Sequence, residues 1–328
     1  LVIPVMYIPK FIKEESQLKT IYNLLVISCI FLSVLGIIQF FSIYFFNYDP
    51  FPIGFFEEEA KRYAIFEYKG ITINRISSLG GEPKHFAYSI AHILPLFIVG
   101  ISLNLIKFRF KFLIIALFLI NLFLTFSTQG YFLFIINLVI SLFLMLFFRR
   151  SNKTIIMTIL FFLFLFFVIL TPTFYNIIMF RTVDRIMETG LLEDWNIAVL
   201  DFLFDNPRYI LTGVGLGNVH FYAKDYIPVF ASHYMYDNVF VAKSGFLRII
   251  SELGIVGFVL FLLSYLKPLI RLFKKARYDN MALLTLIFGL YTLISFALSW
   301  DGPNYIFSAL GILYWYEVRT NGGNKNEN

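Results

Sequence analysis

The sequence has little of what stabilises a small secreted protein or solvates a soluble one. It contains one cysteine and four histidines in 328 residues, and only 15% of its residues are charged. The single cysteine, Cys29, excludes an internal disulfide framework and a cysteine-based zinc site. Hydrophobic residues instead make up 59% of the chain, with 42 phenylalanines among them, which is more apolar surface than a soluble domain buries. The composition predicts an all-α integral membrane protein.

Eight apolar stretches are candidates for membrane-spanning helices. A helix rises about 1.5 Å per residue, so about 20 apolar residues cross the hydrocarbon core of about 30 Å. The expected spans are 21–46, 86–106, 112–128, 131–148, 154–171, 245–266, 280–299 and 303–317. Together they make the chain, 1–328, a single polytopic membrane domain. The chain begins with Leu, and LVIPVMYIP at 1–9 looks like the tail of an earlier span, so we expect it to be the C-terminal part of a longer protein.

Basic residues predict how these spans are oriented. Clusters of Lys and Arg precede the first span, separate the second from the third, the fourth from the fifth and the sixth from the seventh, and follow the last. With eight spans all five clusters lie on one side, which the positive-inside rule makes cytoplasmic. Membrane orientation therefore explains the net charge of +6, and no nucleic-acid partner is expected. The opposite side carries the first outer loop, 47–85, the large outer loop, 172–244, and a short turn near 301–304. The tail, 318–328, is expected to be a disordered cytoplasmic segment.

The large outer loop, 172–244, is too long for a simple connection and keeps its aromatic residues, so we expect it to fold and to hold the functional site. Arg181 and Arg185 are four residues apart and share a face if this segment is helical. Their guanidinium groups suit phosphate oxygens, although a salt-bridged, solvated helix is the simpler alternative. His220 and His233 are candidate bases, because histidine titrates near neutral pH, with a structural or interfacial role as the alternative.

Further motifs follow in the same region. GVGLGN at 213–218 has neither the preceding strand nor the spacing of a nucleotide-binding fingerprint, so it is either a loop reversal or a turn whose amides approach an anion or a sugar. Trp195 can stack on a sugar ring or belong to the interfacial aromatic belt. Arg248 and Glu252 lie four residues apart near the outer end of the sixth span, where we expect an ion pair or a pair lining a wet cavity.

Taken in order, these motifs resemble a known family. Arg181 is followed by Trp195, then by Asn-Pro and GVGLGN, a Tyr- and His-rich stretch, and SGFLRIISELGIVGF at 244–258. This order is similar to the O-antigen polymerase and ligase superfamily, whose members are polytopic membrane glycosyltransferases that act on undecaprenyl-diphosphate-linked glycans. RISSLGGEPKHFAYSIA at 75–91 is also similar to the upstream segment of the polymerases.

The resemblance implies roles for individual residues. It carries over Arg181 as the loop arginine at the diphosphate, Arg75 and Glu82 as a first-loop signature, and Glu252 as the acidic residue of the ELG turn. Together with the candidates that the residues themselves suggest, this gives a catalytic set of Arg181, His233 and Glu252, and a diphosphate- or substrate-binding set of Arg75, Glu82, Arg185, Lys243 and Arg248. Within these sets Arg181 contacts the diphosphate, and His233 is the candidate general base for the acceptor. The chain departs from the ligases at Lys243 and Ser244, where they usually have a His-Asn pair, and at Gln129, where an arginine is common. Both departures favour a polymerase over a ligase.

The implied reaction is polymerisation of undecaprenyl-diphosphate-linked oligosaccharide units into a surface polysaccharide. The glycosyl transfer would be inverting, would need no metal or cofactor, and would occur at the outer face of a bacterial cytoplasmic membrane, with a chain-length regulator as a candidate partner. Ligase-type transfer to another acceptor is one alternative. A flippase or carrier is a second, although carriers usually place their charges at the bilayer midplane. A non-enzymatic membrane scaffold is a third.

Overall fold

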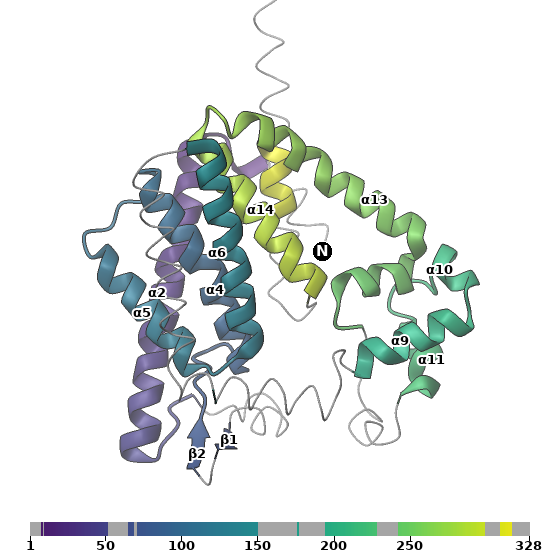
Figure 1. The fold of residues 1–328 in the computed structure, drawn as a ribbon, viewed down its shortest axis with the longest axis horizontal. Helices are drawn as coiled ribbons and strands as arrows, with labels where there is room; N and C mark the ends of the chain where they lie inside the picture. The colour runs from purple at the N-terminus through teal and green to yellow at the C-terminus, as the bar shows by residue number, and fades with distance from the viewer. Residues whose placement is uncertain are drawn as a thin grey trace, which may run out of the picture. The chain divides into compact units, whose positions relative to one another are not determined.

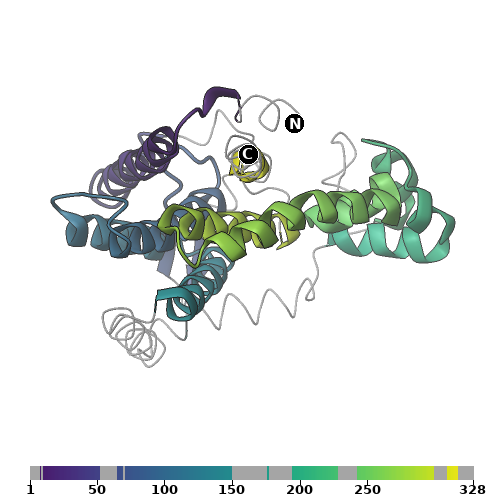
Figure 2. The ribbon, with the colours of Figure 1, turned by 90° about the horizontal axis from the view of Figure 1, so that it is seen from above.

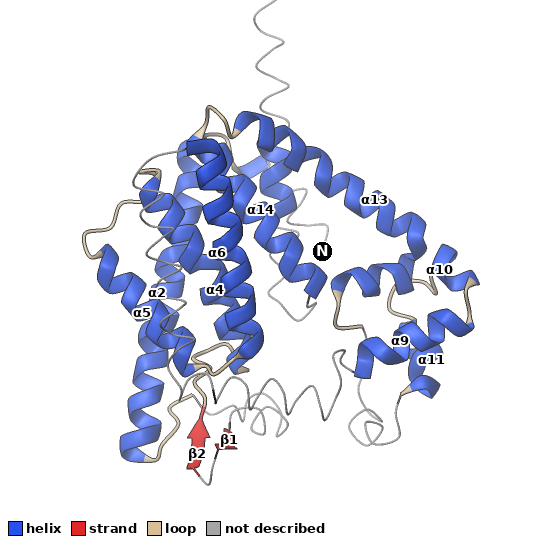
Figure 3. Cartoon of the chain, in the orientation of Figure 1, coloured by secondary structure: helices blue, strands red, loops and turns tan. Residues whose placement is uncertain are grey.

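The computed structural model describes residues 8, 10–51, 65–68, 71–149, 176, 194–227, 242–298 and 309–316. These residues form helices and one two-stranded sheet (Figure 3). The chain divides into two compact units. The bundle unit comprises Ile8–Met179 and Phe273–Tyr291, and the loop unit comprises Leu1–Tyr7, Phe180–Leu272 and Thr292–Asn328.

Among the described residues, five helices are long and apolar enough to cross a membrane. They are α2 (Glu15–Phe46), α4 (Pro83–Ser102), α6 (Thr128–Arg149), α13 (Gly245–Lys275) and α14 (Asn280–Leu298). They confirm five of the expected spans as apolar helices of sufficient length, and they indicate a membrane protein. The expected span at 112–128 corresponds to α5 (Lys111–Leu124), whose 14 residues are shorter than predicted. The expected span at 154–171 lies outside the described residues. Of the expected span at 303–317, the structure describes residues 309–316, all of which are helical.

In the bundle unit α4 is the central helix, and it packs against α2, α5 and α6 (Figure 1). Its apolar window is 72% buried, whereas that of α2 is 28% buried, so α2 presents much of its apolar surface outward, as a lipid-facing helix does. Two buried hydrogen bonds tie the helices together. Tyr22 Oη donates to Thr285 Oγ1 at 3.2 Å, and Asn137 Nδ2 donates to the carbonyl of Ala91 at 3.0 Å. Such bonds satisfy polar groups where water is absent.

A small hairpin interrupts the first outer loop. Strands β1 (Ile65–Tyr68) and β2 (Ile71–Asn74) pair antiparallel, with Ile65 opposite Asn74 and Tyr68 opposite Ile71. The all-α prediction missed this element. The signal was present in the β-branched and aromatic residues of IFEY and ITIN on either side of Lys-Gly, a composition typical of a short hairpin.

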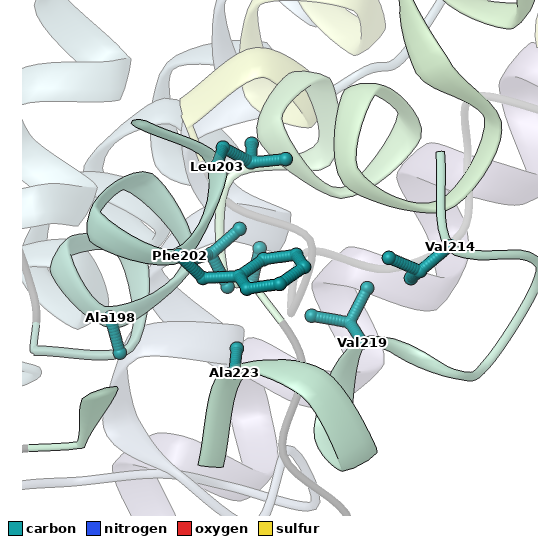
Figure 4. Packing of buried hydrophobic residues seen from close by; sticks show 8 residues of the cluster. Ala198, Phe202, Leu203, Val214, Val219 and Ala223 are labelled. Carbon is teal, nitrogen blue, oxygen red and sulfur yellow. The ribbon is translucent and has the colours of Figure 1, made fainter. Parts of the chain in front are cut away.

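In the loop unit three short helices gather at the N-terminal end of α13 in both views (Figures 1 and 2). They are α9 (Asp194–Asp205), α10 (Arg208–Thr212) and α11 (Val219–Ala223), and a 3-10 turn, η2 (Lys224–Tyr226), follows them. Phe202 of α9 packs with Val214, Val219 and Ala223 in an apolar core of their own (Figure 4). Within the segment 172–244, the described residues 194–227 therefore form a folded set of short helices.

Candidate functional site

The centre of the loop unit is a break in α13 at Gly254. This residue has φ 71° and ψ 180°, a conformation that is essentially restricted to glycine. The N-terminal part of α13, 245–253, turns away from the remainder of the helix (Figure 1). A break of this kind interrupts the i→i−4 hydrogen bonds, and the carbonyls it releases need other donors.

The glycine-rich loop supplies those donors. The N–H of Val214 donates to the carbonyl of Ser251, and the N–H of Gly215 donates to the carbonyl of Glu252, both at 2.9 Å. A side chain at Gly213 would collide with the carbonyl of Glu252, and a side chain at Gly254 would collide with the carbonyl of Leu211. The backbones of 211–215 and 251–254 are therefore interlocked, and glycine is required on both sides. We call this arrangement the glycine interlock.

The interlock supports the interpretation of GVGLGN as a loop reversal. Gly213 N–H donates to the carbonyl of Tyr209 at 2.8 Å, and Asn218 N–H donates to the carbonyl of Gly215 at 3.2 Å. With those of Val214 and Gly215, four of the six amides in this turn bond to protein carbonyls. The loop therefore caps a broken helix, which is a structural role, and its contact with an anion or a sugar stays a prediction.

The other end of this short helix is fixed by a residue that the sequence did not single out. Asn196 of α9 accepts through Oδ1 from the N–H of Lys243 at 3.0 Å and from the N–H of Ser244 at 3.1 Å. Ser244 Oγ donates to the carbonyl of Ala297 at 2.8 Å and accepts from the N–H of Leu247 at 3.4 Å. Asn196 and Ser244 thus satisfy amide donors at the start of α13, which otherwise lack partners within the helix.

Lys243 also contacts Trp195, which is itself a candidate residue of the sequence. Its Nζ lies 5.6 Å from the centroid of the indole ring, within the range of a cation–π interaction. The two residues are far apart in the sequence. Asn196, which follows Trp195, accepts hydrogen bonds from the N–H groups of Lys243 and Ser244 and so holds Trp195 and Lys243 close together. The structure thus gives Lys243 and Trp195 a contact with each other, and their predicted roles toward a substrate stay predictions.

Arg248 and Glu252 form the ion pair that their spacing predicts. Arg248 Nε lies 3.0 Å from Glu252 Oε1, and the side chains are 20% and 7% exposed, respectively. The pair lies on the short helix between the Asn196 cap and the Gly254 break. The main-chain carbonyl of Glu252 also accepts a hydrogen bond from Gly215. Glu252 is therefore held both through its backbone and through its side chain. With so little solvent contact, each charged side chain of the pair requires the other, since an unpaired buried charge is costly.

Arg75 lies in the bundle unit, where it closes the end of α5. Its Nε donates to the carbonyl of Thr125 at 2.8 Å, and the N–H of Ile76 donates to the carbonyl of Leu124 at 3.2 Å. Carbonyls at a helix C-terminus lack intrahelical partners, and a cation there is favoured by the helix dipole. Arg75 as a whole is 7% exposed. Arg75 therefore has a structural role in addition to the binding role that the resemblance implies.

Gln39 anchors the segment that follows Arg75, a role that no sequence motif predicts. Its Oε1 accepts from the N–H groups of Ser77 and Ser78 at 3.0 and 2.8 Å, and its Nε2 donates to Asp49 at 3.1 Å. Gln39 lies on α2 and is buried. Through this single amide, α2 holds both the start of the first outer loop and its end.

Glu82 is the most accessible of the described site candidates in the bundle unit. It is the residue before α4, and its carboxylate pairs with Lys84 Nζ at 3.1 Å and lies 4.0 Å from His85 Nε2. An acidic group at a helix N-terminus is favoured by the helix dipole. Gln129, which stands where an arginine is common in the resembled family, accepts a hydrogen bond from Tyr88 Oη at 2.9 Å.

The structure brings two pairs of the sequence candidates together, Lys243 with Trp195 and Arg248 with Glu252. Trp195, Lys243, Arg248 and Glu252 belong to the loop unit, and Arg75 and Glu82 belong to the bundle unit. His220 contacts the ring of Phe221, with centroids 5.5 Å apart. The candidates Arg181, Arg185 and His233 lie outside the described residues.

Comparison with known proteins adds no relative. No family model matches the chain, and no curated protein matches it. The resemblance stated above therefore rests on the motifs themselves.

Proposed function

We propose that the chain is a membrane glycosyltransferase that polymerises undecaprenyl-diphosphate-linked oligosaccharide units into a surface polysaccharide. The glycine interlock carries this proposal. The two segments that meet in it, GVGLGN at 213–218 and the ELG turn at 252–254, are two of the segments on which the resemblance to the O-antigen polymerases rests. Both segments are therefore parts of one local structure.

The proposal includes a topology. The protein would cross a bacterial cytoplasmic membrane eight times in this chain, with the basic end of α13 in the cytoplasm and the large outer loop, 172–244, on the outer side. Lys274 and Lys275 in the last turn of α13 fit this orientation. The glycine interlock would then lie at the outer end of a span, beside the loop.

The reaction would be a single displacement at the anomeric carbon of the reducing-end sugar. A hydroxyl of an acceptor unit forms the new glycosidic bond as the bond to the diphosphate breaks, and undecaprenyl diphosphate leaves with the electron pair. His233 would take the hydroxyl proton. Arg181 would stabilise the diphosphate charge, an electrostatic term that can supply much of the catalysis.

The remaining assigned residues would support this reaction. Arg185, Lys243 and Arg248 would add positive charge for the diphosphate. Glu252 holds Arg248 in place through their ion pair and has a catalytic assignment by resemblance. Arg75 and Glu82 have a substrate-binding assignment from the same source. No cofactor takes part in this proposal, and a chain-length regulator is its proposed protein partner.

One observation favours a second candidate, a flippase or carrier of lipid-linked glycans. Broken membrane helices often surround the substrate site of transporters, and α13 is broken at Gly254. In those proteins, however, the break lies near the bilayer midplane. Here it lies nine residues from the start of a 31-residue helix, and its released carbonyls are already bonded to the glycine-rich loop.

The test is the glycan-length profile of host cells that lack the chromosomal copy and carry a variant. Glu252→Gln should leave surface glycan of single repeat units, whereas Asp201→Asn, which changes an exposed carboxylate on α9, should give the wild-type ladder. Both variants must reach wild-type membrane levels. Repeat units retained on the cytoplasmic side would identify a flippase, and full-length glycan left on its lipid carrier would identify a ligase.

A further inference from the structure

Exposed apolar side chains surround the break in α13. Leu211 and Leu216 flank the loop side of the glycine interlock, and Leu253 and Val256 flank its helix side. Their exposed fractions run from 41% at Leu253 to 72% at Leu216. The backbone bonds of the interlock bring these residues together, because Leu211 abuts Gly254 and Gly215, next to Leu216, donates to Glu252. We call these four residues the kink patch.

The kink patch continues the exposed apolar surface of α13. Beyond the break, α13 has the length and composition of a membrane span, and only 17% of its apolar window is buried. The exposed side chains along it are Val259, Leu260, Leu263, Leu266 and Ile270. An apolar surface of this extent is not left in water by a folded protein. Val256 and Leu253 are its last members before the break, and the two loop leucines extend it onto the loop unit.

The neighbouring polar groups are of the kind found at the headgroup level. Arg208, at the start of α10, places its guanidinium 4.6 Å from the ring centroid of Tyr209 and donates from Nη2 to Tyr209 Oη at 2.9 Å. Arg and Tyr with apolar bodies and polar tips are enriched where hydrocarbon meets water. Both residues lie within three positions of Leu211.

We propose that the kink patch is inserted in the outer interface of the same bilayer that α13 crosses. The short helices of the loop unit are then seated on the membrane through Leu211 and Leu216 instead of standing in water. The occupant of the patch is lipid, because the patch is continuous with the lipid-facing side of α13. This inference does not depend on the glycosyltransferase proposal, since it concerns where the loop unit sits and not what it catalyses.

A depth measurement on the full-length protein in lipid nanodiscs tests the proposal. Nitroxide labels are attached to single cysteines in a Cys29→Ala background, at Leu211 and Leu216. Val256 serves as the reference on the span itself, and the exposed polar residues Asp205 and Lys224 of the same unit serve as controls. Collision rates with oxygen, which concentrates in lipid, are compared with those of a water-soluble nickel chelate.

Labels at 211 and 216 should favour oxygen over the nickel chelate several-fold, as at 256, and labels at 205 and 224 should show the reverse. Nickel accessibility at 211 and 216 equal to that at 205 would overturn the inference. So would exclusion of both reagents, since that result identifies a protein surface as the occupant. Quenching of Leu216→Trp fluorescence by brominated lipids, measured with Cys29 intact, provides a second readout that is independent of the cysteine-free background.

Discussion

Replacing Gly254 with alanine should disrupt the loop unit. The methyl group would collide with the carbonyl of Leu211, and the backbone would leave the conformation that glycine permits. The collision pushes 211–215 away from 251–254, so the bonds from Val214 and Gly215 weaken together. The expected result is a loosened set of short helices on an intact span.

The magnitude follows from these terms. The backbone conformation costs a non-glycine residue about 1–3 kcal/mol, and each of the two hydrogen bonds contributes about 0.5–1.5 kcal/mol net, so the sum is roughly 2–6 kcal/mol. Gly217→Ala is the matched control. Gly217 has a similar φ of 75°, but among the described residues a methyl group there would meet nothing within 4 Å. Its substitution should cost only the backbone term of about 1–2 kcal/mol.

The assay is unfolding of the full-length protein in detergent, followed by tryptophan fluorescence, with limited proteolysis mapped within 194–227. Trp195 packs against the core of the short helices and reports their loss. Gly254→Ala should lower the unfolding midpoint clearly below that of Gly217→Ala and expose new cleavage sites in 194–227. Equal midpoints and equal cleavage for the two variants would refute the interlock as the element that holds this unit together.

Three further changes test individual contacts. Gln39→Leu leaves the buried N–H groups that its amide serves without an acceptor, at about 1–3 kcal/mol each, and should make the first outer loop protease-sensitive; unchanged cleavage there would contradict its anchoring role. The guanidinium of Arg149 donates three hydrogen bonds, at 2.8–2.9 Å, to Ala276, Arg277 and Asn280, and a lysine cannot reproduce them. Arg149→Lys should therefore lower the free energy of unfolding by about 1–3 kcal/mol in the same assay. A wild-type midpoint would show these bonds to be dispensable. Arg248→Met should lower the free energy of unfolding by up to about 3 kcal/mol, and a second change, Glu252→Gln, should recover much of that loss because it removes the unpaired charge. Strictly additive losses would exclude the pair as a coupled unit.

The apolar runs were sufficient to predict the long helices, because a span is defined by the length and composition of one continuous segment. They overestimated α5, which ends at Leu124 instead of continuing to 128. Its end is set by Arg75 and Ile76, which come from the first outer loop and bond to its last carbonyls. The sequence of 112–128 alone cannot reveal those partners, because they lie elsewhere in the chain.

In the candidate site, too, contacts within one segment were predictable and contacts between distant segments were not. The Arg248–Glu252 pair was predictable, because both residues lie on one helix at a spacing that brings them together. The roles of Asn196 and Gln39 were not, because each serves amides more than 35 residues away in the chain. Gly254 gave no signal by itself, since its required conformation becomes visible only when the glycine-rich loop lies against it.

The most direct test of the proposed function is a mass balance on purified full-length protein in proteoliposomes. The substrate is the host's undecaprenyl-diphosphate-linked repeat unit with an isotopically labelled sugar, and products are separated by glycan length. The account predicts a ladder of repeat multiples, with one undecaprenyl diphosphate released for each new glycosidic bond. Labelled units that cross the bilayer without any ladder and without released undecaprenyl diphosphate would contradict it.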